Sequence, residues 1–200
     1  YTEKMFIMKR LLLILILTFS FQSLIKADDI SDFQIEGMSI GDSLLNFFSK
    51  KKINDNLKNV NYPSDKYLLF EIYKVDHQLN QYDALMVHFK KDDKKYIVYS
   101  VSGVMEFADN IQGCSLKKKE IDLELLKLFK NLERKDYGFN ISKSDKSGKS
   151  SFSEIEYKFP SKDEITIQCY DWSKEIGYMD HLRLSLKHKE FTNWIKNLTY

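Results

Sequence analysis

The residues best suited to chemistry lie in one short stretch near the end of the chain. The segment CYDWS, residues 169–173, places two aromatic side chains around Asp171, and another carboxylate and a histidine follow within ten residues. Aromatic rings beside carboxylates and an imidazole can line a groove for a sugar or a peptide. We therefore predict a binding surface made by five residues: Tyr170, Asp171, Trp172, Asp180 and His181.

The same residues allow an alternative in which the protein is an enzyme. Two carboxylates and a histidine can exchange protons with a substrate, so a small hydrolase using Asp171, Asp180 and His181 is the alternative function. Trp and Tyr at a strand end also pack at the edge of a core, and Asp favours turns. Because aromatic surface is plentiful, we predict a non-catalytic binding or interaction module and assign no catalytic residue.

The four histidines do not form a metal-binding pattern. They are spread along the chain at positions 77, 88, 181 and 188. Zinc sites usually draw on closely spaced ligands such as HxxxH or CxxC, and neither spacing occurs here. We predict that the histidines lie at the surface and that the protein uses no metal or other cofactor.

The first 27 residues have the pattern of a secretory signal peptide. A short basic start at Met8 is followed by an apolar run over residues 11–21, and small residues precede Ala27. The run is shorter than the about 20 apolar residues that cross a bilayer. We predict a start at Met8, with Met5 as the alternative, and cleavage after Ala27. The mature chain would then have no membrane span and would be periplasmic or secreted.

The mature chain, residues 28–200, is close to neutral. The leader carries four Lys or Arg residues and one Glu, so its removal changes the formal net charge from +2 to −1. Nucleic-acid binding depends on clustered Lys and Arg, which argues against a nucleic-acid partner. We expect the partner to be an envelope protein or a small ligand.

Two cysteines, Cys114 and Cys169, remain after the leader. An even pair in a chain sent to an oxidising compartment predicts a disulfide. The bridge would close a loop of about 55 residues and stabilise the fold by roughly 4 kcal/mol in the chain-entropy treatment. The alternative is two buried free thiols.

A helix is predicted over residues 114–132. Its apolar residues recur at helical spacing and form one stripe, made by Cys114, Ile121, Leu125, Leu128, Phe129 and Leu132. Lysines and acids are interleaved on the other faces, at Lys117, Lys118, Lys119, Glu120, Asp122, Glu124, Lys127 and Lys130. We therefore expect the stripe to pack on a sheet and the charged faces to be solvated.

Alternation of apolar and polar residues predicts strands on both sides of this helix. Three strands begin near positions 67, 85 and 97, a weak strand covers 137–141, and three more begin near 154, 165 and 181. An earlier helix is expected where Ser39 can cap the segment that begins at Gly37, and residues 50–61 read as its exit and a surface loop.

These elements predict an α+β fold with an antiparallel sheet and helices on one face. We expect one domain over residues 28–200, built from two units of a helix plus three strands, 37–107 and 114–188. A C-terminal helix over 189–198 closes the chain.

Three segments carry a resemblance to a known set of proteins. They are IEGMSIGDSLLNFF, YDALMVHFKKDDKKYIVYSVSG and CYDWS. With them the chain resembles small exported proteins of AT-rich marine alphaproteobacteria that have no established function. The resemblance covers most of residues 28–200 and implies an envelope or periplasmic location, with no catalytic residue to carry over. The start of the first helix also resembles the helix-plus-three-strand modules of envelope assembly lipoproteins.

Overall fold

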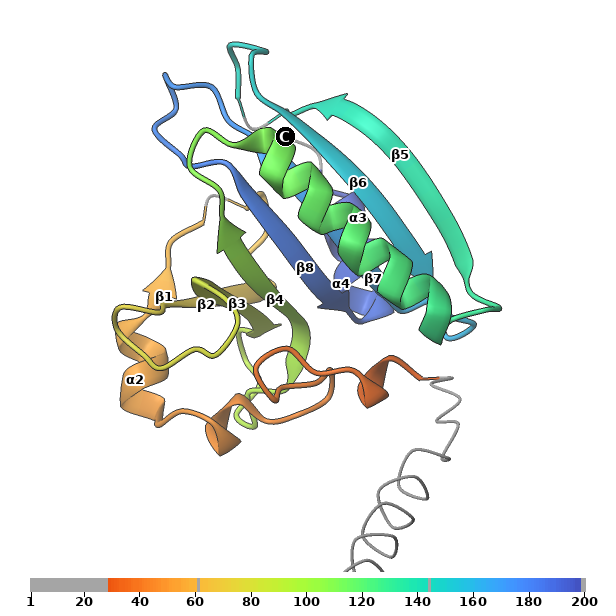
Figure 1. Cartoon of the computed structure of the whole chain (residues 1–200). Coiled ribbons are helices and arrows are strands. Elements are labelled where there is room, and N and C mark those ends of the chain that lie inside the picture. The colour runs from red at the N-terminus through yellow and green to blue at the C-terminus, as the bar shows by residue number, and fades with distance from the viewer. Residues whose placement is uncertain (1–28, 61, 144, 199–200) are drawn as a thin grey trace, which may run out of the picture.

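A computed structural model describes residues 29–60, 62–143 and 145–198, and the predicted leader lies outside these residues. The described chain forms one antiparallel sheet of eight strands in the order β1-β2-β3-β4-β8-β7-β6-β5 (Figure 1). The strands are β1 Leu57–Lys58, β2 Tyr67–Tyr73, β3 Ala84–Lys90, β4 Val98–Glu106, β5 Glu133–Ile141, β6 Ser151–Lys158, β7 Glu164–Asp171 and β8 His181–Lys187. The predicted antiparallel α+β fold is therefore confirmed.

The sheet consists of two meanders that meet at their last strands. Strands β1 to β4 form one half and β5 to β8 the other, and β4 pairs with β8 so that Val101 lies opposite Leu186. Each half contributes four strands, whereas we predicted units of three strands. The junction brings the middle of the chain and its end side by side at the centre of the sheet.

The predicted first helix is wrong. The segment from Gly37 is a loop ending in a single 3₁₀ turn at Leu44–Asn46, and the helix α2, Lys50–Asp55, lies where we predicted a surface loop. The glycines Gly37 and Gly41 have φ values of +80° and +91°, which interrupt a right-handed helix. The backbone N–H of Gly41 donates to the carbonyl of Val98, so tertiary bonds replace helical ones.

The organising helix α3 covers Ile111–Leu128 and packs on β7 and β8. Cys114, Ile121 and Leu125 are buried as predicted. Leu128 was predicted in the stripe but is 60% exposed, and Asp122 was predicted in solvent but is buried. Asp122 accepts hydrogen bonds from Arg134 on β5 and Tyr157 on β6, which turns the helix toward those strands and leaves the flank with Leu128 in solvent.

The predicted disulfide is present and joins α3 to β7. The sulfur atoms of Cys114 and Cys169 are 2.02 Å apart, and the Cα atoms are 6.0 Å apart. Both residues are fully buried between the helix and the sheet. The bridge therefore fixes the position of α3 over the second half of the sheet.

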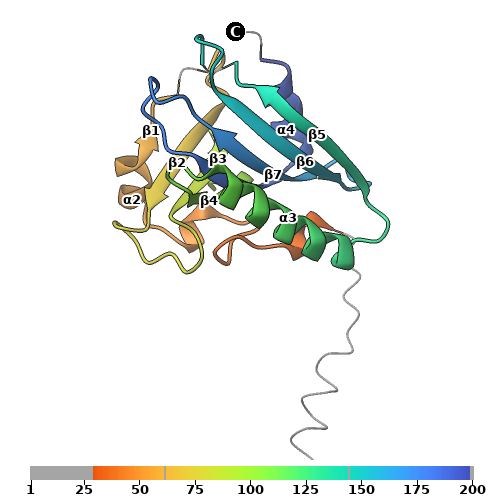
Figure 2. The same ribbon diagram turned by 45° about the horizontal axis from the view of Figure 1, so that its top comes forward.

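The prediction that the helices lie on one face of the sheet is wrong. Tyr157 faces α3, while its neighbour Glu156 points to the other face and receives the Nζ of Lys196 at 3.1 Å. The C-terminal helix α4, Lys189–Lys196, thus covers the face opposite α3, and Figure 2 shows the sheet between the two helices. No helix in the described part of the chain is long and apolar enough to cross a bilayer.

Candidate functional site

The face of the sheet that carries α4 is only partly covered. Phe191 of α4 packs on Tyr67 and His88, at the end of the face where β2 begins. At the other end, cross-strand pairing places Glu106, His181, Tyr170 and Phe152 in one row over β4, β8, β7 and β6. Side chains paired across antiparallel strands share a face, so this row lies on the same face as α4 but outside its cover.

Five ring-bearing residues gather on this row and in the loop that follows β7, and we call them the aromatic cluster: Phe152, Tyr170, Trp172, Tyr178 and His181. The rings of Tyr170 and Trp172 are stacked at 5.3 Å with an interplanar angle of 8°. Tyr170 also stacks on His181 at 4.8 Å and on Phe152 at 5.6 Å. Tyr178 contacts Trp172 edge to face at 5.2 Å. Tyr170 is thus the buried centre around which the other rings are arranged.

Arg183 supports the cluster from the neighbouring position of β8. Its guanidinium lies 4.7 Å from the ring centre of Tyr170, close enough for a cation–π contact. The same group donates to the hydroxyl of Tyr170 and, at 2.8 Å, to Oε1 of Gln168. Gln168 donates in turn to Glu154. Burial raises the pKa of Tyr170, so its hydroxyl stays protonated in this network.

The loop after β7 is held by a buried carboxylate. Asp180 accepts the backbone N–H of Trp172 at 2.8 Å and fixes the turn that carries the indole. Nδ1 of His181 lies 3.0 Å from the carbonyl oxygen of Met179 and 3.3 Å from Nε1 of Trp172. Burial lowers the pKa of His181 to about 4, so the imidazole is neutral at neutral pH. The cluster is therefore hydrogen-bonded to its support and carries no imidazolium charge at neutral pH.

The structure brings together three of the five predicted site residues: Tyr170, Trp172 and His181. Asp180 lies beneath them and supports the backbone of Trp172. Asp171 pairs with Ser151 and alternates with Tyr170, so its side chain starts toward the opposite face. Burial and the charge of Asp180 raise the pKa of Asp171. Within the described residues no hydrogen bond joins a carboxylate to His181.

Sequence reasoning missed Phe152, Tyr178 and Arg183. Phe152 and Arg183 lie on strands that alternate regularly, so the sequence predicts which residues of the same strand share a face with them. Their contact with Tyr170 depends on the register of β6, β7 and β8, which the sequence does not reveal. Tyr178 lies in the loop before Asp180, where no regular alternation predicts the orientation of its side chain.

A hollow of about 390 Å³ lies on the same face, beside the connection from the end of β2 to the start of β3. It is lined by Tyr73, Lys74, Val75, Asp83 and Glu106. Glu106 is the cross-strand partner of His181, so the hollow adjoins the aromatic cluster. Burial and the charge of Asp83 raise the pKa of Glu106.

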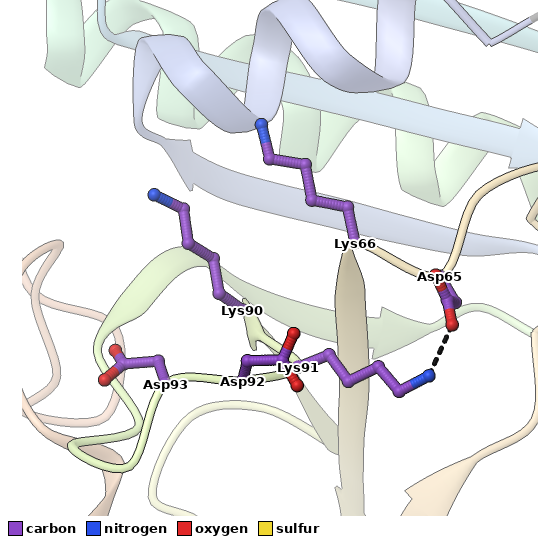
Figure 3. A pocket seen from close by; sticks show the side chains of 6 residues that line it. All are labelled: Asp65, Lys66, Lys90, Lys91, Asp92 and Asp93. Atoms are coloured by element: carbon purple, nitrogen blue, oxygen red, sulfur yellow. Dashed lines mark hydrogen bonds and ion pairs between the residues drawn. The ribbon is translucent and has the colours of Figure 1, made fainter.

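Another hollow lies at the opposite end of β2 and is lined by three lysines and three aspartates (Figure 3). Lys91 pairs with Asp65, and Lys90 pairs with Glu190 of α4 at 2.8 Å. Lys90 Nζ also lies 4.4 Å from the ring centre of Tyr99. The charges are mostly neutralised within the protein, so this hollow has little excess charge to offer an anion.

Two further sequence features have structural roles. GMSIG, residues 37–41, has the spacing of a GxSxG nucleophile motif, but Ser39 is buried and its hydroxyl donates to the carbonyls of Ser31 and Phe33. His88 was predicted at the surface and is buried, because α4 covers it. Burial lowers the pKa of His88 to about 3.

No three His, Cys, Asp or Glu side chains converge in a metal-binding arrangement within residues 29–60, 62–143 and 145–198. Comparison of the chain with protein families, curated proteins and solved structures gave no match. The site must therefore be interpreted from its own geometry.

Proposed function

We propose that this chain is an exported, periplasmic protein that acts as a non-catalytic binding module of the cell envelope. The aromatic cluster is its ligand site. The observation that carries the proposal is the arrangement of Trp172 and Tyr178, which are open to solvent on one side and stacked on a buried, hydrogen-bonded support.

Rigid aromatic surface is suited to binding because little conformational entropy is lost when a ligand docks. Tyr178 is 62% exposed, and Trp172 is half-buried on a ring that Arg183 and Gln168 hold in place. Large aromatic groups exposed together on a well-ordered sheet commonly mark a recognition site.

Export is supported by two independent features. The leader pattern over residues 1–27 is typical of secreted proteins. The disulfide between Cys114 and Cys169 is of the kind that persists in oxidising compartments such as the periplasm.

The hydrolase alternative has less support from the geometry. A general acid–base pair must reach one substrate atom from converging directions. Asp180 is occupied by the backbone of Trp172, while Asp171 starts toward the opposite face of the sheet. His181 has carbonyl and indole neighbours in place of a carboxylate partner.

Tryptophan fluorescence can test the binding function directly. The chain has two tryptophans, so the exported protein carrying Trp194→Phe reports on Trp172 alone. Titration with sugar and peptide libraries and with periplasmic small-molecule extract should shift its emission for at least one ligand, and Tyr178→Ala should weaken that binding. Ligands that bind the protein without changing this emission, and bind Trp172→Ala equally well, would place the site elsewhere.

A further inference from the structure

We infer that the ligand is a neutral oligosaccharide chain that crosses the strands from the aromatic cluster to the hollow beside Glu106. The inference rests on the proposed binding function and adds the chemical class and the path of the ligand. Its two anchor points are the exposed ring of Tyr178 with the half-buried indole of Trp172, and the hollow walled by Tyr73.

The two anchor points lie on one face of the sheet. Register places Tyr73 opposite Ala84, Ala84 opposite Val104, and Val104 opposite Arg183. Arg183 lies over the ring of Tyr170, so the row that begins in the hollow ends at the cluster. The two residues between the anchors, Ala84 and Val104, have short side chains that are buried among their neighbours, so a ligand on this row would contact the taller side chains beside them.

The distance between the anchors fits a chain and exceeds a single sugar. Tyr73 on β2 and Tyr170 on β7 are separated by four steps between neighbouring strands, which amounts to about 19 Å. A monosaccharide placed on Trp172 would leave the hollow empty, whereas an oligosaccharide lying across the strands would reach both ends.

The functional groups along this path match a polyhydroxylated ligand. The ring of Tyr178 is exposed and that of Trp172 is half-buried with one face on Tyr170, and aromatic rings at a surface pack against the C–H faces of sugar rings. The carboxylates of Glu106 and Asp83 accept hydrogen bonds from hydroxyl groups, and the neutral imidazole of His181 lies between them and the rings.

The lining also discriminates between ligand classes. The hollow has two carboxylates against one ammonium, Lys74, so its net charge disfavours acidic sugars. Extended peptides usually bind by adding a strand to a sheet edge, through main-chain hydrogen bonds. This site is on a sheet face, where the backbone groups of β4, β7 and β8 are already paired. Side chains alone are available, which favours a sugar over a peptide.

Calorimetric titration with two length series tests the inference. The probes are cello-oligosaccharides and N-acetylglucosamine oligomers, each from the disaccharide to the hexasaccharide. In at least one series the affinity should rise about tenfold or more with length, because the longer chain also engages the hollow. Tyr73→Ala and Glu106→Gln should each lower the hexasaccharide affinity by most of that gain.

A matched control is Phe139→Ala on β5. Phe139 is an exposed aromatic residue whose strand partner, Ser153, receives a hydrogen bond from Lys118 of α3, so it lies on the other face. This variant should bind both lengths as the unaltered protein does, and thermal melts should show that all variants fold.

The possible failures are distinguishable. Sugar binding that Trp172→Ala abolishes but that shows no gain with length would overturn the path across the sheet and leave the binding function standing. If neither series binds, the sugar assignment is wrong, and the fluorescence titration decides the binding function separately.

Discussion

Removal of the disulfide gives the most direct test of how the fold is stabilised. The double variant Cys114→Ala/Cys169→Ala opens a loop whose ends are 55 residues apart. In the chain-entropy treatment, closing a loop of this length lowers the entropy of the unfolded chain by an amount worth about 4 kcal/mol at room temperature. Total stabilities of domains are about 5–15 kcal/mol, so the variant should lose a large fraction of its stability.

Urea unfolding followed by circular dichroism, without reductant, measures this loss. The single variant Cys114→Ala is the matched control, because it also opens the loop and should lose a similar amount. Wild-type protein unfolded with reductant should approach the stability of the double variant. A double variant within about 1 kcal/mol of the wild type would refute the claim that the bridge supplies a large fraction of the stability.

Three further outcomes follow from buried polar groups. The hydroxyls of Thr166 and Thr192 are buried without a hydrogen-bond partner, so Thr166→Val with Thr192→Val should raise the unfolding free energy by about 1–3 kcal/mol in urea titration; a decrease would contradict this. Burial lowers the pKa of His88 to about 3 and of His181 to about 4. Below about pH 6.5 the two histidines take up protons in the unfolded chain before they do so in the folded protein. The free energy of unfolding should therefore be constant in this respect above about pH 6.5 and fall as the pH drops toward 4, by up to about 1.4 kcal/mol per pH unit for each histidine. Thermal melts over that range measure the fall, and a flat profile would contradict the burial argument. Asp122→Ala removes the carboxylate that accepts from Arg134 and Tyr157, so Arg134 loses its bidentate partner and Tyr157 keeps only the backbone carbonyl of residue 122. The change should cost about 2–4 kcal/mol, whereas Glu124→Ala on the solvated face should cost little.

The strands and the disulfide could be predicted because they depend on local patterns. The alternation around Ile155 and Ile165 reflects a sheet with an apolar face under α3 and a more polar face on the side of α4, and an even cysteine pair after a leader indicates a bridge. The first helix could not be predicted correctly. Its sequence has a capping serine and an apolar spacing, but the positive φ of Gly37 and Gly41 and hydrogen bonds to Tyr96 and Val98 decide the local structure.

The candidate site was only half predictable for a similar reason. Tyr170, Trp172 and His181 are close in sequence and were predicted together. Arg183 and Glu106 come into contact with them through the pairing of β8 with β7 and of β4 with β8. The pairing between strands of two different meanders joins residues far apart in the sequence and depends on which face of the sheet is buried under α3. A single sequence therefore does not reveal it.

The aromatic cluster and the disulfide occupy adjacent residues on opposite faces of β7. Cys169 is bonded to α3 on one face, and Tyr170 supports the exposed rings on the other. A strand held by a covalent bond on its core side can present aromatic groups on its outer side without yielding when a ligand packs against them. Preorganisation of this kind lowers the entropy lost on binding. The covalent attachment of α3 is therefore connected through one strand to the surface that we propose binds the ligand, although the helix itself covers the other side of the sheet.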